Sequence, residues 1–293
     1  MTFPPRSNAP PTLAPLRFGY NTNGFAHHSL DESVRVLSDL GYDGVALTLD
    51  VHHCNPFIVS QCDLTALDRL LKQLNLAVVI ETGARFLLDP RRKHEPTLIS
   101  AEPDGRARRL DFLKKSVDIA RFLGAEAVSF WSGKKSDAVS DSQALLWLRE
   151  HCSALADDAA NKGVQLAFEP EPGMFIADLP AFLNLKSQIS NPAFGLTLDI
   201  GHYFITETAP FPEGFARVAP LVRNIHIEDI KNRRHEHLPF GEGDLPFPKI
   251  LETLKRHNCS APINVELSRD SHRAPEVAAA ALKFLRAHST EML

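Results

Sequence analysis

Short apolar runs alternate with amphipathic segments along the whole chain. A run of four to eight apolar residues bounded by polar residues predicts a buried strand, whereas apolar positions three or four residues apart predict a helix. Eight runs predict strands at residues 16–20, 44–49, 77–80, 127–130, 164–168, 195–198, 222–225 and 263–265. Helices are expected between and after them, at about residues 29–40, 63–74, 106–123, 140–161, 179–188, 213–219, 247–257 and 275–287.

The first helix has clear sequence boundaries. Ser29 and Glu32 have the spacing of a capping box, and Gly41 suits the left-handed residue that ends a helix. Alternating strands and helices predict a parallel sheet, and eight such units predict an α/β fold, a single closed (β/α)8 TIM barrel. A doubly wound open sheet is the alternative, but residues 20–24 lack the glycine-rich phosphate turn that usually follows its first strand.

The barrel domain is expected to span residues 16–293. Residues 1–15 contain five prolines and no apolar stretch like that of a signal peptide, so they predict a flexible N-terminal tail. The longest aliphatic run, residues 277–282, is too short to cross a bilayer. The four cysteines include no CxxC pair, as is typical of reduced thiols. We expect a cytoplasmic protein without membrane contact. A homo-oligomer is compatible with the sequence.

Composition and charge narrow the class of partner. The 293 residues are 44% hydrophobic and 23% charged, which is ordinary for a globular protein. The formal net charge is −4, so a nucleic-acid partner is not expected.

The last four strands each end at a residue type that binds metals. Glu169, Asp199, His226 and Glu266 stand directly after these strands. Because the C-terminal ends of barrel strands converge on one face, the four side chains are expected to meet. Two glutamates, an aspartate and a histidine suit a divalent ion such as Mn²⁺, Mg²⁺, Co²⁺ or Zn²⁺. One such residue would be an ordinary polar strand end, but four in succession predict a metal site.

Two long loops are expected on the same face, at residues 82–105 and 228–247. Loops of this length at the C-terminal end of a barrel often cover a substrate. In the second loop, we expect Asp229 to orient a ligand or to face solvent, and Gly241 and Gly243 to shape the backbone. Both loops carry basic residues, which are compatible with an anionic substrate. They are Arg85, Arg91, Arg92, Lys93, Lys231, Arg233 and Arg234.

The four strand-end residues and their surroundings resemble the xylose isomerase-like TIM-barrel superfamily, which contains sugar isomerases, sugar epimerases and endonuclease IV enzymes. The resemblance implies that Glu169, Asp199, His226 and Glu266 bind a catalytic metal ion, with Mn²⁺ as the first candidate. The most specific matches are Asp-Ile-Gly-His at 199–202 and Ile-His-Ile-Glu-Asp at 225–229, and further matches are at 166–173, 241–244 and 264–266.

The resemblance implies a metal-dependent isomerase or epimerase acting on a small carbohydrate, a sugar or polyol ketone that could be anionic. Such an enzyme removes a proton from a carbon next to a carbonyl, and a metal stabilises the resulting enediolate. A carboxylate on each face of the substrate can remove and return the proton. The family implies that Glu169 and Glu266 are these catalytic carboxylates.

The chain departs from the family's ketose 3-epimerases at two positions. They often carry a glutamate six residues after the first ligand, where this chain has Phe175, so Glu171 is a candidate substitute. They also often carry an arginine six residues after the strand-seven histidine. Here that residue is Asn232, and the neighbouring Arg233 becomes a candidate substrate contact. These two departures do not support assigning a free ketohexose as the substrate.

Several histidines leave a second metal or a substrate contact open. His202 matches a family histidine that contacts substrate in epimerases and a second metal in endonuclease IV. His53 and His94 follow strands two and three, and His235 and His237 lie in the loop after strand seven. The alternative for His202 is a buried, hydrogen-bonded core histidine, and the alternative for the loop histidines is a solvated surface position.

Two other functions remain open. An endonuclease IV-like phosphoesterase would use several metal ions, but Glu81 ends strand three where those enzymes have a histidine, and the acidic balance counts against DNA. A non-catalytic sugar-binding barrel is less favoured, because the complete set of four metal-type residues is present.

Overall fold

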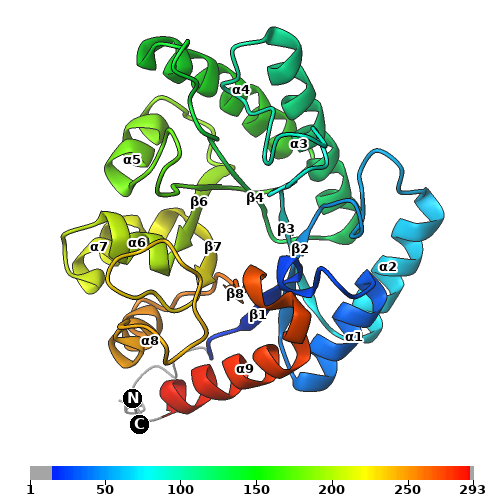
Figure 1. Ribbon diagram of the computed structural model, residues 1–293, viewed down its shortest axis with the longest axis vertical. Helices are drawn as coiled ribbons and strands as arrows, with labels where there is room; N and C mark the ends of the chain where they lie inside the picture. The colour runs from blue at the N-terminus through cyan, green and yellow to red at the C-terminus, as the bar shows by residue number, and fades with distance from the viewer. Residues whose placement is uncertain (1–14, 291–293) are drawn as a thin grey trace, which may run out of the picture.

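The chain folds into a closed barrel of eight parallel strands surrounded by helices (Figure 1). The computed structural model describes residues 15–290. Neighbouring strands pair in sequence order, and the eighth pairs with the first, which confirms the predicted (β/α)8 fold. The strands are β1 (Phe18–Asn21), β2 (Gly44–Thr48), β3 (Ala77–Glu81), β4 (Val128–Trp131), β5 (Leu166–Glu169), β6 (Phe194–Asp199), β7 (Val222–Ile227) and β8 (Ile263–Val265). The predicted tail at residues 1–15 lies outside the described residues except for Pro15.

Helices lie close to their predicted positions, except that the helix at Ile200–Thr206 was not predicted. Ser29 forms the expected capping box with Glu32, and Gly41 ends the helix at φ 93°. An unpredicted second box, Ser60 with Asp63, starts α2 two residues before the expected boundary. The helices are α1 (Leu30–Leu40), α2 (Gln61–Gln73), α3 (Pro103–Leu123), α4 (Asp141–Asn161), α5 (Leu179–Ser187), α6 (Ile200–Thr206), α7 (Phe211–Val218), α8 (Phe247–Arg256) and α9 (Ala274–Thr290).

The interior of the barrel is layered because side chains alternate along each strand. A lower layer of small apolar side chains lies beneath a layer of buried polar ones, and the candidate ligands stand above both. The apolar layer contains Ala46, Val79, Ala127 and Ala167. The polar layer contains Ser129, Thr197, Asn224 and Asn264. The strand period thus positions a polar floor under the C-terminal opening.

Aromatic residues fill the space between the strands and the helices on one side of the barrel. Phe168 on β5 lies 5.3 Å from Phe130 on β4, measured between ring centroids. Phe182 of α5 stacks on both Phe168 and Phe194, at 6.1 Å from each ring. All four rings are buried. Since aromatic side chains bury large apolar areas, this cluster fixes α5 against the strands that carry Glu169 and Asp199.

No helix within residues 15–290 has both the length and the apolar character needed to cross a lipid bilayer.

Removing the Phe182 ring should destabilise the barrel. Phe182→Ala leaves a cavity in the aromatic cluster, and its free energy of unfolding is expected to fall by about 3–5 kcal/mol. Phe122→Ala is the matched control, because Phe122 on α3 is 37% exposed. Urea unfolding followed by circular dichroism measures both. Equal losses for the two variants would contradict the assignment of Phe182 to the core.

Candidate metal centre

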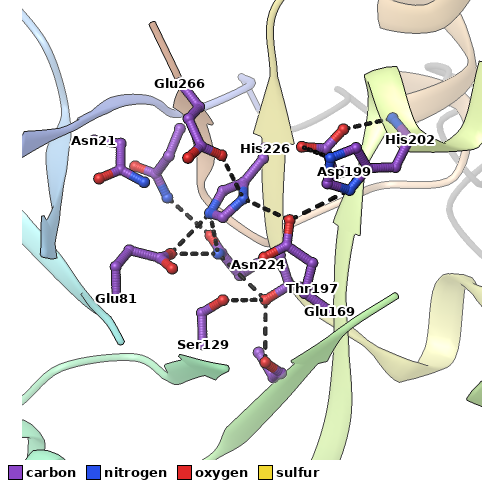
Figure 2. A network of polar contacts seen from close by, with 12 residues as sticks. Asn21, Glu81, Ser129, Glu169, Thr197, Asp199, His202, Asn224, His226 and Glu266 are labelled. Atoms are coloured by element: carbon purple, nitrogen blue, oxygen red, sulfur yellow. Dashed lines mark hydrogen bonds and ion pairs between the residues drawn. The ribbon is translucent and has the colours of Figure 1, made fainter. Parts of the chain in front are cut away.

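Four side chains meet where the last four strands end. Glu169 and Asp199 close β5 and β6, His226 lies in β7, and Glu266 directly follows β8. One ligand atom from each lies within 4.8 Å of the others. Figure 2 shows three of them, Glu169, His226 and Glu266, pointing toward one another. β7 is two residues longer than predicted because His226 and Ile227 pair with β8, but the expected convergence of the four residues is present.

His226 is the centre of this cluster. Its Nδ1 lies 3.2 Å from Glu169 Oε1 and 3.2 Å from Glu266 Oε2. Its Nε2 lies 2.8 Å from Glu81 Oε1. Nε2 donates to Glu81 Oε1 when it carries the ring hydrogen, and Asn224 Nδ2 lies 3.1 Å from the same ring nitrogen. A neutral imidazole in this tautomer presents the lone pair of Nδ1 to the space between Glu169 and Glu266.

Glu81 is a residue whose role sequence reasoning missed. It is buried on β3 and also accepts a hydrogen bond of 3.0 Å from Asn224 Nδ2. Asn224 in turn accepts one of 2.8 Å from Asn264 Nδ2. A carboxylate that holds the far nitrogen of a histidine orients the ring and raises its basicity toward a metal. The available signal was that Glu81 directly follows a predicted strand, as the other ligands do.

Burial and mutual charge shift the pKa values of the cluster. Burial raises the pKa of Glu169 well above its usual value. Burial also acts to raise the pKa of Glu266 and Asp199, but nearby histidines outweigh it and hold both pKa values below their usual range. Burial acts to lower the pKa of His226, but the carboxylates around the ring outweigh burial and hold this pKa well above its usual value. The cluster therefore needs a positive charge among its carboxylates.

The residues fit a divalent ion. Asp199 Oδ1 accepts a hydrogen bond of 2.7 Å from the His202 backbone N–H, while Asp199 Oδ2 is buried without a hydrogen-bond partner. A buried carboxylate oxygen without a partner is unfavourable unless another group satisfies it. Three carboxylates and one imidazole form an O/N donor set suited to Mn²⁺, Mg²⁺, Co²⁺ or Zn²⁺. Glu169, Asp199, His226 and Glu266 could therefore hold such an ion.

The candidate ligands lie at the bottom of a polar pocket of ≈ 260 Å³. Glu169, His226 and Glu266 line it, whereas Asp199 does not. The indole of Trp131 adds an apolar wall, and the buried guanidinium of Arg109 lies 4.7 Å from that ring. Cationic side chains lie on the wall as well: Arg85, Lys93 and Arg269. Arg269 was not among the basic residues singled out from the sequence.

Three of the predicted histidines form a second group in the pocket. His202, His235 and His237 each place a ring nitrogen within 4.8 Å of the others. His202 Nδ1 lies 3.3 Å from the Pro170 carbonyl oxygen, so Nδ1 carries the hydrogen. His202 Nε2 is then an acceptor, at 2.9 Å from His235 Nε2. Burial lowers the pKa of His202 to about 4, so its ring is neutral near pH 7.

A buried glutamate lies behind this histidine group. Both carboxylate oxygens of Glu228 are buried without a hydrogen-bond partner, and so is His237 Nδ1. Glu228 Oε2 and His237 Nδ1 are 4.0 Å apart. Sequence reasoning missed Glu228, whose position in the loop after β7 gave no pattern that separated it from its neighbours.

Of the remaining predicted residues, His94 lies in the metal pocket, whereas His53 and Arg233 lie outside it. His94 lines the metal pocket and bonds the Gly83 carbonyl oxygen through Nδ1 at 2.8 Å. His53 does not reach this pocket, because its Nε2 bonds the His28 carbonyl oxygen at 2.9 Å. Arg233 lies on the surface, where it donates a 2.6 Å hydrogen bond to the Ile205 carbonyl oxygen near the end of α6. The structure therefore does not bring His53 or Arg233 to the candidate metal.

Asp229 differs from both roles expected of it. Its buried carboxylate accepts hydrogen bonds from the backbone N–H groups of Ile230, Gly241, Gly243 and Leu245. Asp229 therefore holds the loop after β7 in shape rather than orienting a ligand or facing solvent. Gly241 adopts φ 89°, and a Cβ at Gly243 would collide with Asp229, so the predicted role of both glycines is confirmed.

Glu171 lies in the pocket, as a substitute for the family glutamate would require. It lines the cavity, and burial together with nearby carboxylates raises its pKa to about 8. Phe175 instead packs against the hydrophobic core. A contact between Glu171 and substrate stays a prediction.

Comparison with known proteins identifies the family. The family model described as xylose isomerase-like TIM barrel matches residues 34–288, so the chain belongs to that family, as the sequence motifs predicted. L-ribulose-5-phosphate 3-epimerase UlaE of Salmonella typhi is 25% identical over 245 residues, which cover 83% of this chain and 84% of that protein.

Two solved structures share the fold. A D-tagatose 3-epimerase-like protein superposes with a TM-score of 0.74 at 20% identity, covering 93% of this chain and 99% of that one. An IolI protein with a bound zinc atom superposes with a TM-score of 0.77 at 15% identity, covering 95% and 99%. At these identities the likeness shows the fold alone.

Removing the charge of Glu81 should weaken metal binding without removing a ligand. Glu81→Gln no longer fixes the tautomer of His226, and Mn²⁺ affinity is expected to fall about 10- to 100-fold. Titration calorimetry with Mn²⁺ measures the effect. Glu242→Gln is the control, since it removes an exposed carboxylate from the loop after β7. The same affinity in both variants would contradict the orienting role of Glu81.

Proposed function

We propose that the protein is a divalent-metal-dependent sugar or polyol-ketone isomerase or epimerase. The observation that carries the proposal is the meeting of Glu169, Asp199, His226 and Glu266, three of which line a polar pocket. The relative from Salmonella typhi is named as a sugar-phosphate 3-epimerase, which supports the same class of reaction here. Mn²⁺ is the first candidate for the ion, and the zinc-bound fold relative supports divalent-metal binding in general.

The two glutamates are suited to moving a proton. Epimerisation requires that a proton leaves one face of a carbon and returns on the other, so two bases must approach the substrate from different sides. Glu169 and Glu266 come from β5 and the end of β8, which are separated by β6 and β7. A divalent ion bound there supplies electrostatic stabilisation for the negative charge on the substrate oxygens.

The Glu266 side chain is held in place by a second residue. Asn23 Nδ2 donates a hydrogen bond of 2.8 Å to Glu266 Oε1, while Glu266 Oε2 faces His226. Fixing both oxygens restricts the rotation of the carboxylate. An acid–base group that is fixed before the substrate arrives loses less entropy when the reaction begins.

The pocket wall supports a hydroxylated substrate that could carry negative charge. Hydroxyl groups need several hydrogen-bonding partners, and the polar side chains of the pocket provide them. Within residues 15–290, the side chains of Lys93 and Arg269 form no hydrogen bond or ion pair. Both are therefore free to contact a phosphate or carboxylate of the substrate.

Glu266→Gln should remove most of the turnover. The amide keeps the size of the side chain but lacks its charge and its basic oxygen, so activity is expected to fall by at least about 10²–10⁴-fold. The assay follows loss of the substrate C–H proton by NMR in D₂O, beside metal analysis of the same sample. Glu276→Gln on the surface of α9 is the control. Near-normal turnover with full metal occupancy would refute the role of Glu266.

A multinuclear phosphoesterase is the second candidate, favoured by the group of His202, His235 and His237. Three imidazole nitrogens in this arrangement are compatible with Zn²⁺ binding. The hydrolase would require more than one ion in each chain, whereas the isomerase requires one.

His237→Ala separates these two candidates. We expect one tightly bound ion in both wild type and variant, with any change confined to substrate affinity, because His237 lies outside the four main ligands. Elemental analysis after identical dialysis gives the number of ions, and His272→Ala, an exposed histidine, serves as control. Two or more ions in wild type, with one lost in His237→Ala together with phosphodiesterase activity, would favour the hydrolase instead.

A further inference from the structure

A second cavity of ≈ 290 Å³ adjoins the metal pocket. Ala26, Val51 and Phe86 contribute its apolar surface, and most of the wall is apolar, in contrast to the metal pocket. The cavity lies between the segment after β1 and the loops after β2 and β3. Nothing in the proposed proton transfer uses it.

The two cavities share part of their walls. Asn23, Thr48 and Arg85 line both of them. Asn23 is the residue that bonds Glu266, and Arg85 Nη2 donates a hydrogen bond of 2.8 Å to the Asn23 carbonyl oxygen. A single residue, Asn23, therefore lies between the second cavity and the candidate catalytic carboxylate of Glu266.

The boundary has an unused hydrogen-bond acceptor. Asn23 Oδ1 is buried without a hydrogen-bond partner, although Asn23 Nδ2 is engaged by Glu266. A buried acceptor of this kind is unfavourable in the free protein and is satisfied when a ligand hydroxyl donates to it. A ligand that passes Asn23 would thus gain a hydrogen bond at the boundary and apolar contact beyond it.

Large apolar side chains are left exposed around the second cavity. Val51 is 50% exposed and Phe86 is 47% exposed, although both line the cavity. Contact with an apolar group would remove this surface from water, which is the main source of affinity for such groups. Asp50, His52 and His53 also line the cavity, but the larger part of its wall is apolar, so a polyhydroxylated group would find fewer partners there than in the metal pocket.

We propose that the second cavity binds an apolar substituent of the substrate whose sugar part occupies the metal pocket. The substrate class is then a sugar that carries an aromatic or alkyl group, rather than a free monosaccharide. This inference rests on the proposed function for the identity of the sugar part. The size is adequate, because an apolar cavity of about 150 Å³ accepts benzene.

A protein partner is the competing occupant. Phe57 and Ile58 are exposed in the loop after β2 but do not line the cavity. A second copy of the chain seated on this loop would bury them together with Val51. Substitutions inside and outside the cavity therefore distinguish a substrate group from a protein surface.

The test compares D-fructose with 6-O-benzyl-D-fructose by titration calorimetry on the Mn²⁺-treated full chain. Wild type is expected to bind the benzyl ketose roughly tenfold to hundredfold more tightly. Val51→Asp should reduce this preference at least tenfold, and Phe86→Ala should reduce it without introducing a charge. Ile58→Asp is the matched control from the same loop and should keep the preference.

Equal binding of the two ketoses by wild type, or no binding of either, would overturn the inference. It would also fail if Ile58→Asp and Val51→Asp reduced the preference equally while dissociating an oligomer in sedimentation. Proton exchange from D-fructose in D₂O, measured on the same samples, tests the proposed function separately. Exchange with equal binding refutes the second cavity alone, whereas benzyl preference without exchange upholds the cavity and excludes D-fructose as a substrate of the proposed reaction.

Discussion

The crowding of carboxylates around one imidazole is the constraint on which the site depends. Glu81, Glu169 and Glu266 surround His226 in a buried space, and Asp199 adds another acidic group beside them. Like charges in a medium of low dielectric constant repel strongly unless a positive charge lies among them. Either a proton on His226 or a bound cation can supply it. A divalent cation satisfies more of the oxygens, including the unpartnered Asp199 Oδ2.

The barrel can hold this charged cluster because the polar groups beneath it are hydrogen-bonded and the surrounding core is well packed. Buried amide and hydroxyl groups of Asn224, Asn264 and Thr197 bond one another and the carboxylate of Glu81. Aromatic packing against α5 stabilises the neighbouring strands β5 and β6. The stability of the fold therefore comes from regions other than the charged cluster. Because the charged cluster is not needed for the stability of the fold, the strand ends can carry residues that serve the reaction.

The strand pattern was sufficient to predict the fold and the four main candidate ligands. A strand end in a parallel barrel has a fixed position, so Glu169 and Asp199 could be placed together from sequence alone. Loop residues could not be placed in this way. Arg233 turns to the carbonyl groups near α6, and Asp229 gathers four backbone N–H groups, because of contacts formed only after folding. Glu81 occupied a predictable position, but its bond to His226 depends on a strand 145 residues away.

We propose that the carboxylate cluster moves a proton with the help of a bound divalent ion. The most direct measurement is deuterium incorporation, by NMR in D₂O, at the carbon next to the carbonyl of ketopentoses and ketohexoses, free and phosphorylated. Protein loaded with Mn²⁺ should exchange this proton in at least one ketose, lose the activity with EDTA, and regain it when Mn²⁺ is restored. Exchange that is insensitive to complete metal removal, or tight sugar binding with no exchange in any metal-loaded sample, would contradict the account.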